Sequence, residues 1–379
     1  MRVGLDGFPL VSPRTGVGHY TLELARALAQ ISPDDEFYLI APVPLPGPIV
    51  NEISQTAPSN LQVNIPKSSS FRRKWWAVGL PLFLRNASLD LFHGTNYDIP
   101  LWNRDRSVLT IHDLSILLYP EHHQPKLVRR GHYRLPLMAR GAAKIITVSE
   151  SVKGEICEHL GVAPEKVVVT REAPRRSFRR LPLQETEKIR RRLNIEEEFI
   201  LFVGTIEPRK NLPTLLRTFE KIVTTTSLTP QLVIAGGEGW MMEEFLNLAG
   251  GPHIRDRLRL TGYVNDDDLR ALYSSCRVFV YPSLYEGFGL PPLEAMACGA
   301  PVVTSRIPSI VETVGSAALL VEPRDEDGFT ASIVELLTDV NKRQYYSTAG
   351  LAHAAGFSWA QTARDTLEVY QEVIDRKKH

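Results

Sequence analysis

Short apolar runs alternate with stretches of helical periodicity along most of the chain. The runs that predict strands lie at 3–6, 37–40, 89–93, 108–112, 144–148 and 167–170, and then at 199–203, 232–235, 258–261, 278–281, 302–304 and 318–321. Helical patterns lie at 19–30, 126–139, 151–159, 212–222, 240–247, 267–274, 291–298, 341–354 and 360–375. Because apolar strands that alternate with helices form parallel sheets covered on both faces, the pattern predicts an α/β fold.

The alternation lapses between 171 and 198, where Pro174, Pro182 and many arginines precede a charged, helix-like stretch. A chain of 379 residues is too long for one hydrophobic core, so we interpret this segment as a linker between two domains. The predicted domains are Rossmann-like and span 1–175 and 176–358. A final helix in 359–379 is expected to pack back toward the first domain. The segment 42–70, rich in Pro, Ser and Asn, is expected to be a mobile loop region.

The composition is that of a globular protein, with 43% hydrophobic and 23% charged residues. The net charge of +1 gives no reason to expect a nucleic-acid partner. Cys157, Cys276 and Cys298 are widely spaced, so we expect reduced thiols rather than disulfides or a metal site. The sequence has no secretory signal pattern and no apolar run long enough to span a bilayer, which predicts a cytoplasmic protein.

The segment 282–299 carries the strongest chemical signal, because it follows an apolar strand and opens a helix. Gly287 and Gly289 allow the backbone to approach a ligand closely, and the amides at a helix start bind phosphate. Glu286 stands before this turn and Glu294 lies inside the helix. Since open α/β sheets bind ligands at the carboxyl ends of their strands, the segment predicts a binding site for a phosphorylated ligand.

A second candidate segment, 202–212, also leads from a strand into a helix and contains Arg209 and Lys210. A cation at this place can offset negative charge that grows on a departing phosphate. A solvated basic turn is the alternative for both side chains, and for Arg209 the two readings are equally balanced.

Histidine and glycine residues mark two further strand ends. His112 ends the run 108–112, where it can present its imidazole or its backbone to a ligand, although a lone histidine is more often structural. His93 ends a neighbouring run and fits an acceptor contact or a core position equally well. Gly16 and Gly18 follow the first strand and allow close backbone approach, but plain turn geometry explains them too.

The stretch EGFGLPPLEAMACGAPV, with two glutamates separated by seven residues, resembles the signature of retaining glycosyltransferases of family 4. This resemblance implies the GT-B fold, in which two Rossmann-like domains carry parallel sheets that face an interdomain cleft. It implies that Glu286 contacts the transferred sugar and that Glu294 holds the ribose of the nucleotide. The amides of the intervening turn would touch the diphosphate or the sugar; they belong to Gly287, Phe288, Gly289 and Leu290.

Other segments match the family position by position. Gly204 and Lys210 fit the glycine and the lysine of a basic element of the family, but Thr205 stands where many members have arginine, and Arg209 is the candidate to compensate. The resemblance further places four other predicted site features near the donor: His112 beside the sugar, Tyr263 and Val264 beside the base, and the Gly16/Gly18 loop on the acceptor and phosphate side.

The resemblance implies a hexose transfer from a nucleotide-diphosphate sugar to a glycan or lipid-linked acceptor. The anomeric configuration would be retained, with the donor phosphate assisting deprotonation of the acceptor. GDP-mannose is the first candidate donor and a UDP-hexose such as UDP-glucose the second. The predicted catalytic residues are Glu286, His112 and Lys210. We expect no metal and no other cofactor, because no DxD motif lies in a suitable loop and Lys210 and the helix start at 287–290 would stabilise the leaving phosphate.

Three other functions remain as alternatives. A GT-B epimerase or phosphorylase would share the fold, and a sugar-binding module without activity would share the site. A Rossmann oxidoreductase would need a GxGxxG turn, and the segment that begins at Gly16 lacks the third glycine. The basic and aromatic run from Phe71 to Trp76 either contacts a membrane surface at the inner face or, as we favour, begins a helix with buried tryptophans.

Overall fold

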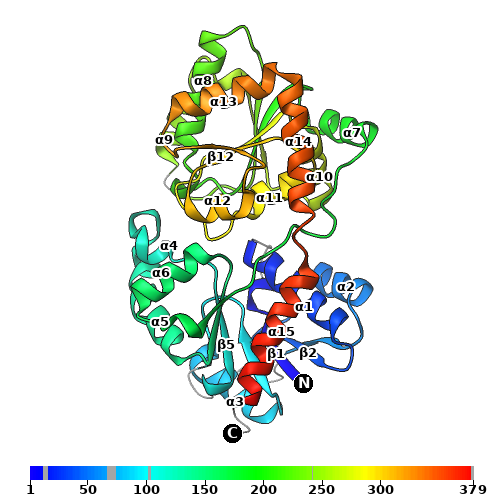
Figure 1. The fold of residues 1–379 in the computed structure, drawn as a ribbon, viewed down its shortest axis with the longest axis vertical. Helices are drawn as coiled ribbons and strands as arrows, with labels where there is room; N and C mark the ends of the chain where they lie inside the picture. Colours follow the sequence, from blue (N-terminus) through cyan, green and yellow to red (C-terminus); the bar gives the residue numbers. More distant parts are fainter. Residues whose placement is uncertain (12–15, 66–73, 101–103, 241, 377–379) are drawn as a thin grey trace. The chain divides into compact units, whose positions relative to one another are not determined.

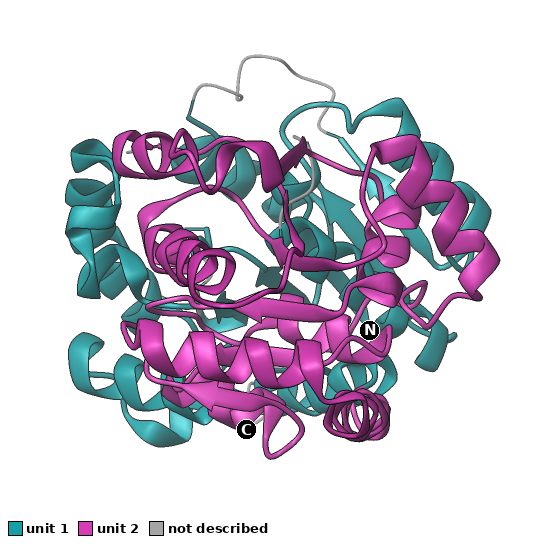
Figure 2. Cartoon of the chain, turned by 90° about the horizontal axis from the view of Figure 1, so that it is seen from above, with its two compact units in different colours: residues 1–172, 358–379 teal, residues 173–357 magenta. Residues whose placement is uncertain are grey.

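The computed structural model describes residues 1–11, 16–65, 74–100, 104–240 and 242–376. The chain divides into two compact units, residues 1–172 with 358–379 and residues 173–357 (Figures 1 and 2). Each unit is a parallel sheet covered by helices, which confirms the predicted α/β class. The predicted boundaries at 175 and 358 lie close to these divisions of the chain.

The first unit is built on a parallel sheet with the strand order β3-β2-β1-β4-β5-β6-β7. Its strands are β1 (Arg2–Asp6), β2 (Glu36–Ile40), β3 (Leu61–Asn64), β4 (Leu91–Gly94), β5 (Ser107–Ile111), β6 (Lys144–Thr147) and β7 (Val167–Val169). The strand order reverses direction between β1 and β4, which pair in parallel. The carboxyl ends of these two strands therefore flank the place where open α/β sheets bind ligands.

The helices of the first unit include one from the far end of the chain. They are α1 (Gly16–Ile31), α2 (Gly47–Thr56), α3 (Leu80–Asn86), α4 (Ser115–Leu118), α5 (Pro125–Gly141), α6 (Glu150–Leu160) and α15 (Trp359–Asp375). The C-terminal helix α15 packs along α1 (Figure 1). The Tyr370 hydroxyl lies 2.7 Å from Nδ1 of His93 on β4, and Lys144 on β6 forms a 2.8 Å ion pair with Glu372.

Local sequence explains where the helices begin and end. Ser149 caps α6 by accepting a hydrogen bond from the amide of Val152 at 3.2 Å, and Gly161 ends that helix in the left-handed conformation. Asn265 caps α10 (Asp266–Ser275) in the same way, through the amide of Asp268 at 2.9 Å. Polar caps of this kind satisfy amides that have no partner inside the helix.

The second unit has a parallel sheet with the order β10-β9-β8-β11-β12-β13. Its strands are β8 (Phe199–Val203), β9 (Gln231–Ala235), β10 (Leu258–Gly262), β11 (Val278–Tyr281), β12 (Val302–Ser305) and β13 (Leu319–Val321). Its other helices are α7 (Leu183–Leu193), α8 (Leu212–Thr225), α9 (Glu243–Ala249), α11 (Leu290–Ala297), α12 (Pro308–Val314), α13 (Glu326–Thr338) and α14 (Val340–Ala354). The helices α8, α9 and α13 pack together, as do α7 with α10 and α11 with α14 (Figure 1).

The expectation of a loop region at 42–70 was wrong. This segment contains α2 and the edge strand β3, because Ile49, Ile53 and Leu61 are buried although polar residues surround them, and its residues 66–70 lie outside the described residues. The chain passes from the first unit to the second after residue 172, inside the expected linker 171–198, but from Ala173 onward this segment belongs to the second unit and its helix α7 packs on α10.

The run from Phe71 to Trp76 is described only from residue 74 onward; Phe71 to Arg73 lie outside the described residues. Trp75 is 6% exposed and packs with the core residues Tyr38, Ile40, Leu80 and Phe92, and Trp76 packs against this cluster. The structure therefore supports the core reading for Trp75, whereas Trp76 is only half-buried. Across the part of the chain that the structure describes, no helix is long and apolar enough to cross a membrane.

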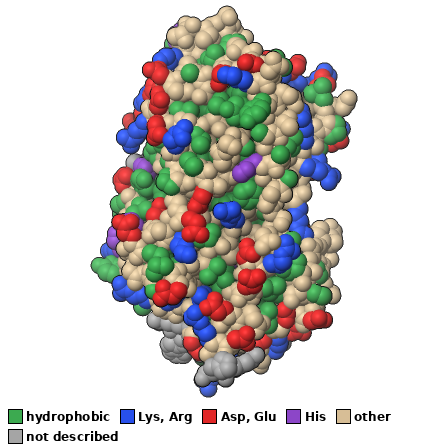
Figure 3. Space-filling model, viewed as in Figure 1, with side chains coloured by type: hydrophobic (Ala, Val, Ile, Leu, Met, Phe, Trp, Pro, Cys, Tyr) green, Lys and Arg blue, Asp and Glu red, His purple; other side chains and the backbone are tan. Residues whose placement is uncertain are grey.

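Figure 3 and the cysteine environments add two observations on side chains. On the face shown in Figure 3, basic and acidic side chains are interspersed, in keeping with the small net charge. All three cysteines are free thiols; Cys276 and Cys298 are buried and Cys157 is half-buried.

Candidate active site

The candidate site of the second unit lies where its strand order reverses direction. Strands β8 and β11 are neighbours in the sheet, although the chain forms β9 and β10 between them. The segment after β8 carries Lys210 in a 3-10 turn, and the segment after β11 carries Glu286 before helix α11. The parallel sheet thus brings together two side chains that are 76 residues apart.

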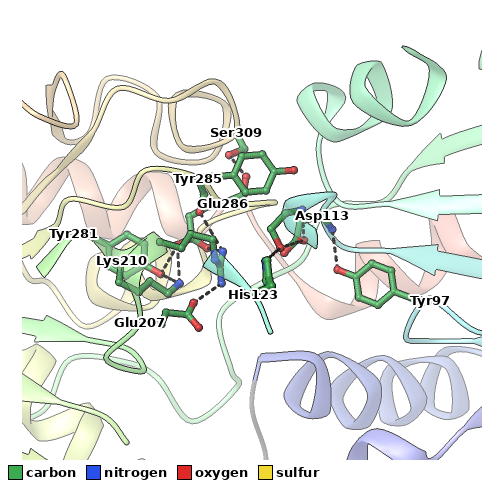
Figure 4. A network of polar contacts seen from close by, with 11 residues as sticks. Tyr97, Asp113, His123, Glu207, Lys210, Tyr281, Tyr285, Glu286 and Ser309 are labelled. Atoms are coloured by element: carbon green, nitrogen blue, oxygen red, sulfur yellow. Dashed lines mark hydrogen bonds and ion pairs between the residues drawn. The ribbon is translucent and has the colours of Figure 1, made fainter. Parts of the chain in front are cut away.

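Glu286, Lys210 and Tyr281 form a closed set of hydrogen bonds (Figure 4). The ammonium of Lys210 donates to Oε1 of Glu286 at 2.6 Å and to the hydroxyl of Tyr281 at 2.7 Å. The same hydroxyl donates to Oε1 of Glu286 at 2.9 Å. Lys210 and Glu286 are each 8% exposed and Tyr281 is fully buried, so the rigid end of β11 fixes the position of the pair.

Arg209 completes this cluster from the other side of the carboxylate. Its Nη1 donates to Oε2 of Glu286 and to the carbonyl of Tyr285, both at 3.1 Å, and its Nη2 donates to Glu207 at 2.9 Å. The carbonyl of Arg209 accepts from the amide of Leu284 at 2.8 Å. Of the two balanced readings for Arg209, the structure supports a place at the site over a solvated basic turn.

The charges of the cluster control the ionisation of its members. Burial alone would raise the pKa of Glu286, but the positive charges of Lys210 and Arg209 outweigh it and lower the pKa to about 2. Burial lowers the pKa of Lys210, and Arg209 adds to that effect, while Glu286 and Glu207 oppose it. Burial also raises the pKa of Tyr281 well above its ordinary value, so this hydroxyl stays a donor.

The turn between Glu286 and α11 is held by helix α12. Ser309 donates to the carbonyl of Glu286, and Thr313 donates to the carbonyl of Phe288, both at 2.6 Å. Gly289 has φ 102°, and a Cβ at this position would lie 2.4 Å from Cδ1 of Ile310. Only glycine therefore fits at this point without strain.

The first turn of α11 offers few backbone N–H groups that could bind a phosphate. The helix begins at Leu290, and the next two residues, Pro291 and Pro292, carry no N–H. The amides that a phosphate could contact are thus restricted to Leu290 and to the turn before it. Gly287, Phe288 and Gly289 form that turn, beside the carboxylate of Glu286.

Glu294 lies one helical turn further along α11 and is 5% exposed. Its two carboxylate oxygens accept from Nε and Nη2 of Arg175 at 2.7 and 2.8 Å. Arg175 also donates through Nη1 to Asp266 at 2.7 Å and lies 3.9 Å from the ring centre of Phe178. Arg175 was not among the site residues predicted from the sequence.

The other predicted donor residues lie at the same edge of the sheet. Gly204 directly follows β8 and has φ 153°. Its carbonyl would lie 2.0 Å from a Cβ added at Gly236, so the turns after β8 and β9 touch through their backbones. Thr205 is half-buried and packs its methyl group toward Gly239. Tyr263 follows β10 with 67% exposure, and Val264 beside it is half-buried.

In the first unit, His112 follows β5 and both of its ring nitrogens have partners. Nδ1 lies 3.3 Å from a carboxylate oxygen of Glu172, and Nε2 lies 2.9 Å from the carbonyl of Thr95, which can only accept. The imidazole is 9% exposed, and Tyr20 packs edge-on against it. His112 is therefore held firmly in place, whereas its predicted role beside a sugar stays a prediction.

His93 is a core residue. It is fully buried between the hydroxyls of Tyr370 and Thr110, each 2.7 Å from a ring nitrogen, and burial lowers its pKa to about 3. This supports the core reading over an acceptor contact. Gly16 and Gly18 lie inside the first turn of α1 rather than in a loop, and a Cβ at Gly16 would meet open space. The residues just before Gly16, 12–15, lie outside the described residues.

A further polar network of the first unit follows β5 and was missed from the sequence. Asp113 accepts from the amide and the hydroxyl of Ser115 at 2.9 and 2.8 Å, and its own amide donates to the hydroxyl of Tyr97 at 3.2 Å (Figure 4). His123 lies 3.1 Å from the hydroxyl of Ser115. In the second unit, Glu207 lies inside the segment 202–212 and Tyr281 directly before the segment 282–299, yet neither was predicted as a site residue. Ser309 lies on α12, outside both segments, and was not predicted either. Among the described residues, no three His, Cys, Asp or Glu side chains are grouped as metal ligands.

Comparison with known families gives two matches that together cover most of the chain. Residues 14–171 match the model of "Glycosyltransferase Family 4", and residues 184–353 match that of "Glycosyl transferases group 1". The first match covers β2 to β7 and the second covers β8 to β13. The segment of 282–299 and the segment of 202–212 both fall in the second match.

Two curated relatives and one solved structure extend this similarity. O-antigen chain mannosyltransferase B of Escherichia coli is 33% identical, over 96% of this chain and 97% of its own length. Serotype-specific mannosyltransferase WbdA of Escherichia coli is 32% identical over 71% of this chain, which corresponds to 34% of WbdA. The crystal structure of Anabaena HepE in complex with UDP and glucose superposes with a TM-score of 0.75 at 18% identity, over 98% of this chain and 99% of that one.

Proposed function

Because this chain belongs to glycosyltransferase family 4, we propose that it transfers mannose from GDP-mannose to a glycan or a lipid-linked saccharide, with retention of the anomeric configuration. The chain is a glycosyltransferase with the GT-B fold. The observation that carries the proposed transfer from a nucleotide-diphosphate sugar is the cluster of Lys210, Arg209 and Glu286 beside the start of α11.

The proposed donor site is the carboxyl edge of β8 and β11. An ammonium has three N–H donors, and in the described part of the chain Lys210 uses two of them, toward Glu286 and Tyr281. The third would donate to a diphosphate oxygen. Arg209 adds a second positive charge at the same place, so negative charge that grows on the leaving diphosphate would be stabilised without reorganisation of the site.

Glu286 is suited to orient the sugar rather than to remove a proton. A carboxylate with a pKa of about 2 is a weak base near neutral pH, but it accepts hydrogen bonds from hydroxyl groups well. Its negative charge also favours the positive charge that develops at the anomeric carbon in an oxocarbenium-like transition state. Glu286 would thus hold the sugar hydroxyls and stabilise the reacting ring.

The proposed reaction proceeds on one face of the sugar. The bond between the anomeric carbon and the diphosphate oxygen breaks, and the acceptor oxygen forms its bond to the same carbon. The acceptor proton passes to an oxygen of the leaving diphosphate. In this route Lys210 and Arg209 supply the electrostatic stabilisation, so we propose that the reaction needs no metal ion or other cofactor.

The identity of the donor is supported by the relatives. Both curated relatives reported above are named mannosyltransferases, and they match this chain at 33% and 32% identity. A UDP-hexose is the second candidate, and HepE, which shares the fold, was crystallised with UDP and glucose. The name of O-antigen chain mannosyltransferase B supports a polysaccharide under construction as the acceptor.

A thermal-shift screen of the full chain against GDP, UDP, ADP and their sugars tests this proposal. A nucleotide that binds the native state raises the melting temperature by mass action, so GDP and GDP-mannose should raise it most. A larger shift with UDP and UDP-glucose would favour the second candidate. The absence of any shift at millimolar nucleotide would contradict the proposed donor site.

A further inference from the structure

Arg175 and Glu294 form a two-pronged ion pair inside the second unit. The guanidinium presents Nε and Nη2 to the two carboxylate oxygens at 2.7 and 2.8 Å, the parallel geometry that arginine alone provides. The side chain of Arg175 is 11% exposed and that of Glu294 is 6% exposed. A pair this well shielded from water holds one geometry.

Two further contacts fix the guanidinium itself. Asp266, at the first turn of α10, accepts from Nη1 at 2.7 Å, and the ring of Phe178 lies 3.9 Å from the guanidinium carbon. The guanidinium of Arg175 is thus hydrogen-bonded to a second carboxylate at its edge and packs its flat face on an aromatic ring. The carboxylate of Glu294 cannot rotate without breaking both of its hydrogen bonds to the guanidinium of Arg175.

Burial and Arg175 act on the pKa of Glu294 in opposite directions. Burial raises the pKa of this carboxyl group, and the charge and hydrogen bonds of Arg175 oppose the shift. Each carboxylate oxygen has two lone pairs, so a carboxylate that binds arginine on one side can still accept hydroxyl groups on the other. A ribose offers two neighbouring hydroxyl groups, which match such a fixed pair of acceptors.

We propose that Arg175 is a positioning residue for recognition of the nucleotide ribose, because its guanidinium fork holds the Glu294 carboxylate in the orientation that accepts the 2′- and 3′-hydroxyl groups. This inference rests on the proposed function, in which Glu294 binds the ribose. Arg175 does not touch the nucleotide in this account and acts through Glu294 alone. Charge is not sufficient for the role, since a lysine at this position cannot make two parallel bonds.

The test compares nucleotides that differ only in these hydroxyl groups. Isothermal titration calorimetry would measure the affinities of the full chain for GDP and 2′,3′-dideoxy-GDP, and for the corresponding UDP pair. Wild-type protein should prefer the ribonucleotide by roughly 10- to 100-fold, as expected for hydroxyl groups that bind a carboxylate. R175Q, R175K and E294Q should each reduce this preference to roughly threefold or less, mainly by lowering the affinity for the ribonucleotide.

Matched controls separate positioning from a general loss of structure. D266N leaves both bonds to Glu294 in place and should keep most of the preference. The double variant R175Q/E294Q should lose no more of the preference for the ribonucleotide than either single variant does, because the two side chains act as one unit. Melting temperatures of all variants would show that each is folded.

The possible outcomes are distinct. An R175Q or R175K protein that keeps the full preference for the ribonucleotide would overturn the positioning role, and so would an equal loss of affinity for both nucleotides. If wild-type protein binds neither GDP nor UDP, the proposed function itself fails and the role of Arg175 fails with it. A preference that E294Q removes and both Arg175 variants retain would leave the ribose contact intact and reject Arg175.

Discussion

The ammonium of Lys210 lies 2.6 Å from Oε1 of Glu286, and each side chain is only 8% exposed. Two ions buried so deeply are stable only as a pair, since removal of one leaves the other in a poorly hydrated place. Arg209 and Glu207 extend the pair to a cluster with two positive and two negative charges. An incoming diphosphate would meet cations that are already fixed in position.

The pair should make stability depend on pH in a defined window. The pKa of Glu286 in the folded chain, about 2, is below its ordinary value of 4.5, so the folded state binds fewer protons than the unfolded state between these values. The stabilisation is therefore fully present above about pH 4.5 and is lost as the pH falls toward 2. Urea unfolding across this window should give a shallower pH dependence for the E286Q/K210M variant than for the wild type. Equal slopes for the two proteins would show that Glu286 ionises normally.

Lys210 and Arg209 should both contribute to nucleotide affinity. We expect K210M to raise the dissociation constant for GDP or UDP by roughly 10- to 100-fold, the usual cost of one charge-assisted hydrogen bond, and R209M to act in the same direction. Arg217 on α8 pairs with Glu244 at the surface, so R217M is a matched control that should bind normally. Calorimetry on the three variants checks this, and a K210M protein with wild-type affinity would remove the lysine from the donor site.

Much of the candidate site followed from the sequence because strand ends can be read from apolar runs. Phe199–Val203 and Val278–Tyr281 are apolar throughout and were predicted within the observed bounds. Parallel sheets place their carboxyl ends at one edge, which is why Lys210 and Glu286 could be expected to meet. The position of Arg209 after the strand Phe199–Val203 could be predicted in the same way, but the direction of its side chain depends on tertiary packing.

The remaining features depend on packing that no local pattern records. Arg175 is 119 residues from Glu294, and nothing in the run around Pro174 distinguishes it from the neighbouring arginines. The edge strand Leu61–Asn64 has a single buried residue, so its apolar signal was too weak to stand out from a polar segment. The pairing of His93 with Tyr370 joins residues 277 apart.

Gly289 should not tolerate a side chain. In G289A the new Cβ would meet Ile310, and φ 102° is strained for alanine, so the turn that carries Glu286 must shift. We expect a lower melting temperature and a loss of transfer activity of at least about tenfold. Gly154 in α6 is a matched control, because a Cβ there meets open space and alanine favours a helix. A G289A protein as stable and active as G154A would contradict this account of the turn.

Transfer should continue without divalent metal ions. In the proposed donor site Lys210 and Arg209 would balance the charge of the diphosphate, so we expect EDTA to leave the initial rate within about twofold of the untreated enzyme. The measurement is the release of nucleoside diphosphate from the sugar donor with and without EDTA. A loss of activity that Mg²⁺ or Mn²⁺ restores would overturn the metal-free mechanism.

The central claim is that the carboxylate of Glu286, set between Lys210 and Arg209, binds and activates the sugar of a nucleotide donor. The most direct measurement is mannose transfer from GDP-mannose to a mannose oligosaccharide by wild-type, E286Q and E286Q/K210M proteins of equal melting behaviour, with the product anomer identified by NMR. We expect the wild type to form an α-mannoside and both variants to lose at least about 1000-fold in kcat/KM, the effect of losing a main transition-state contact. Undiminished transfer by a folded E286Q protein would contradict the claim.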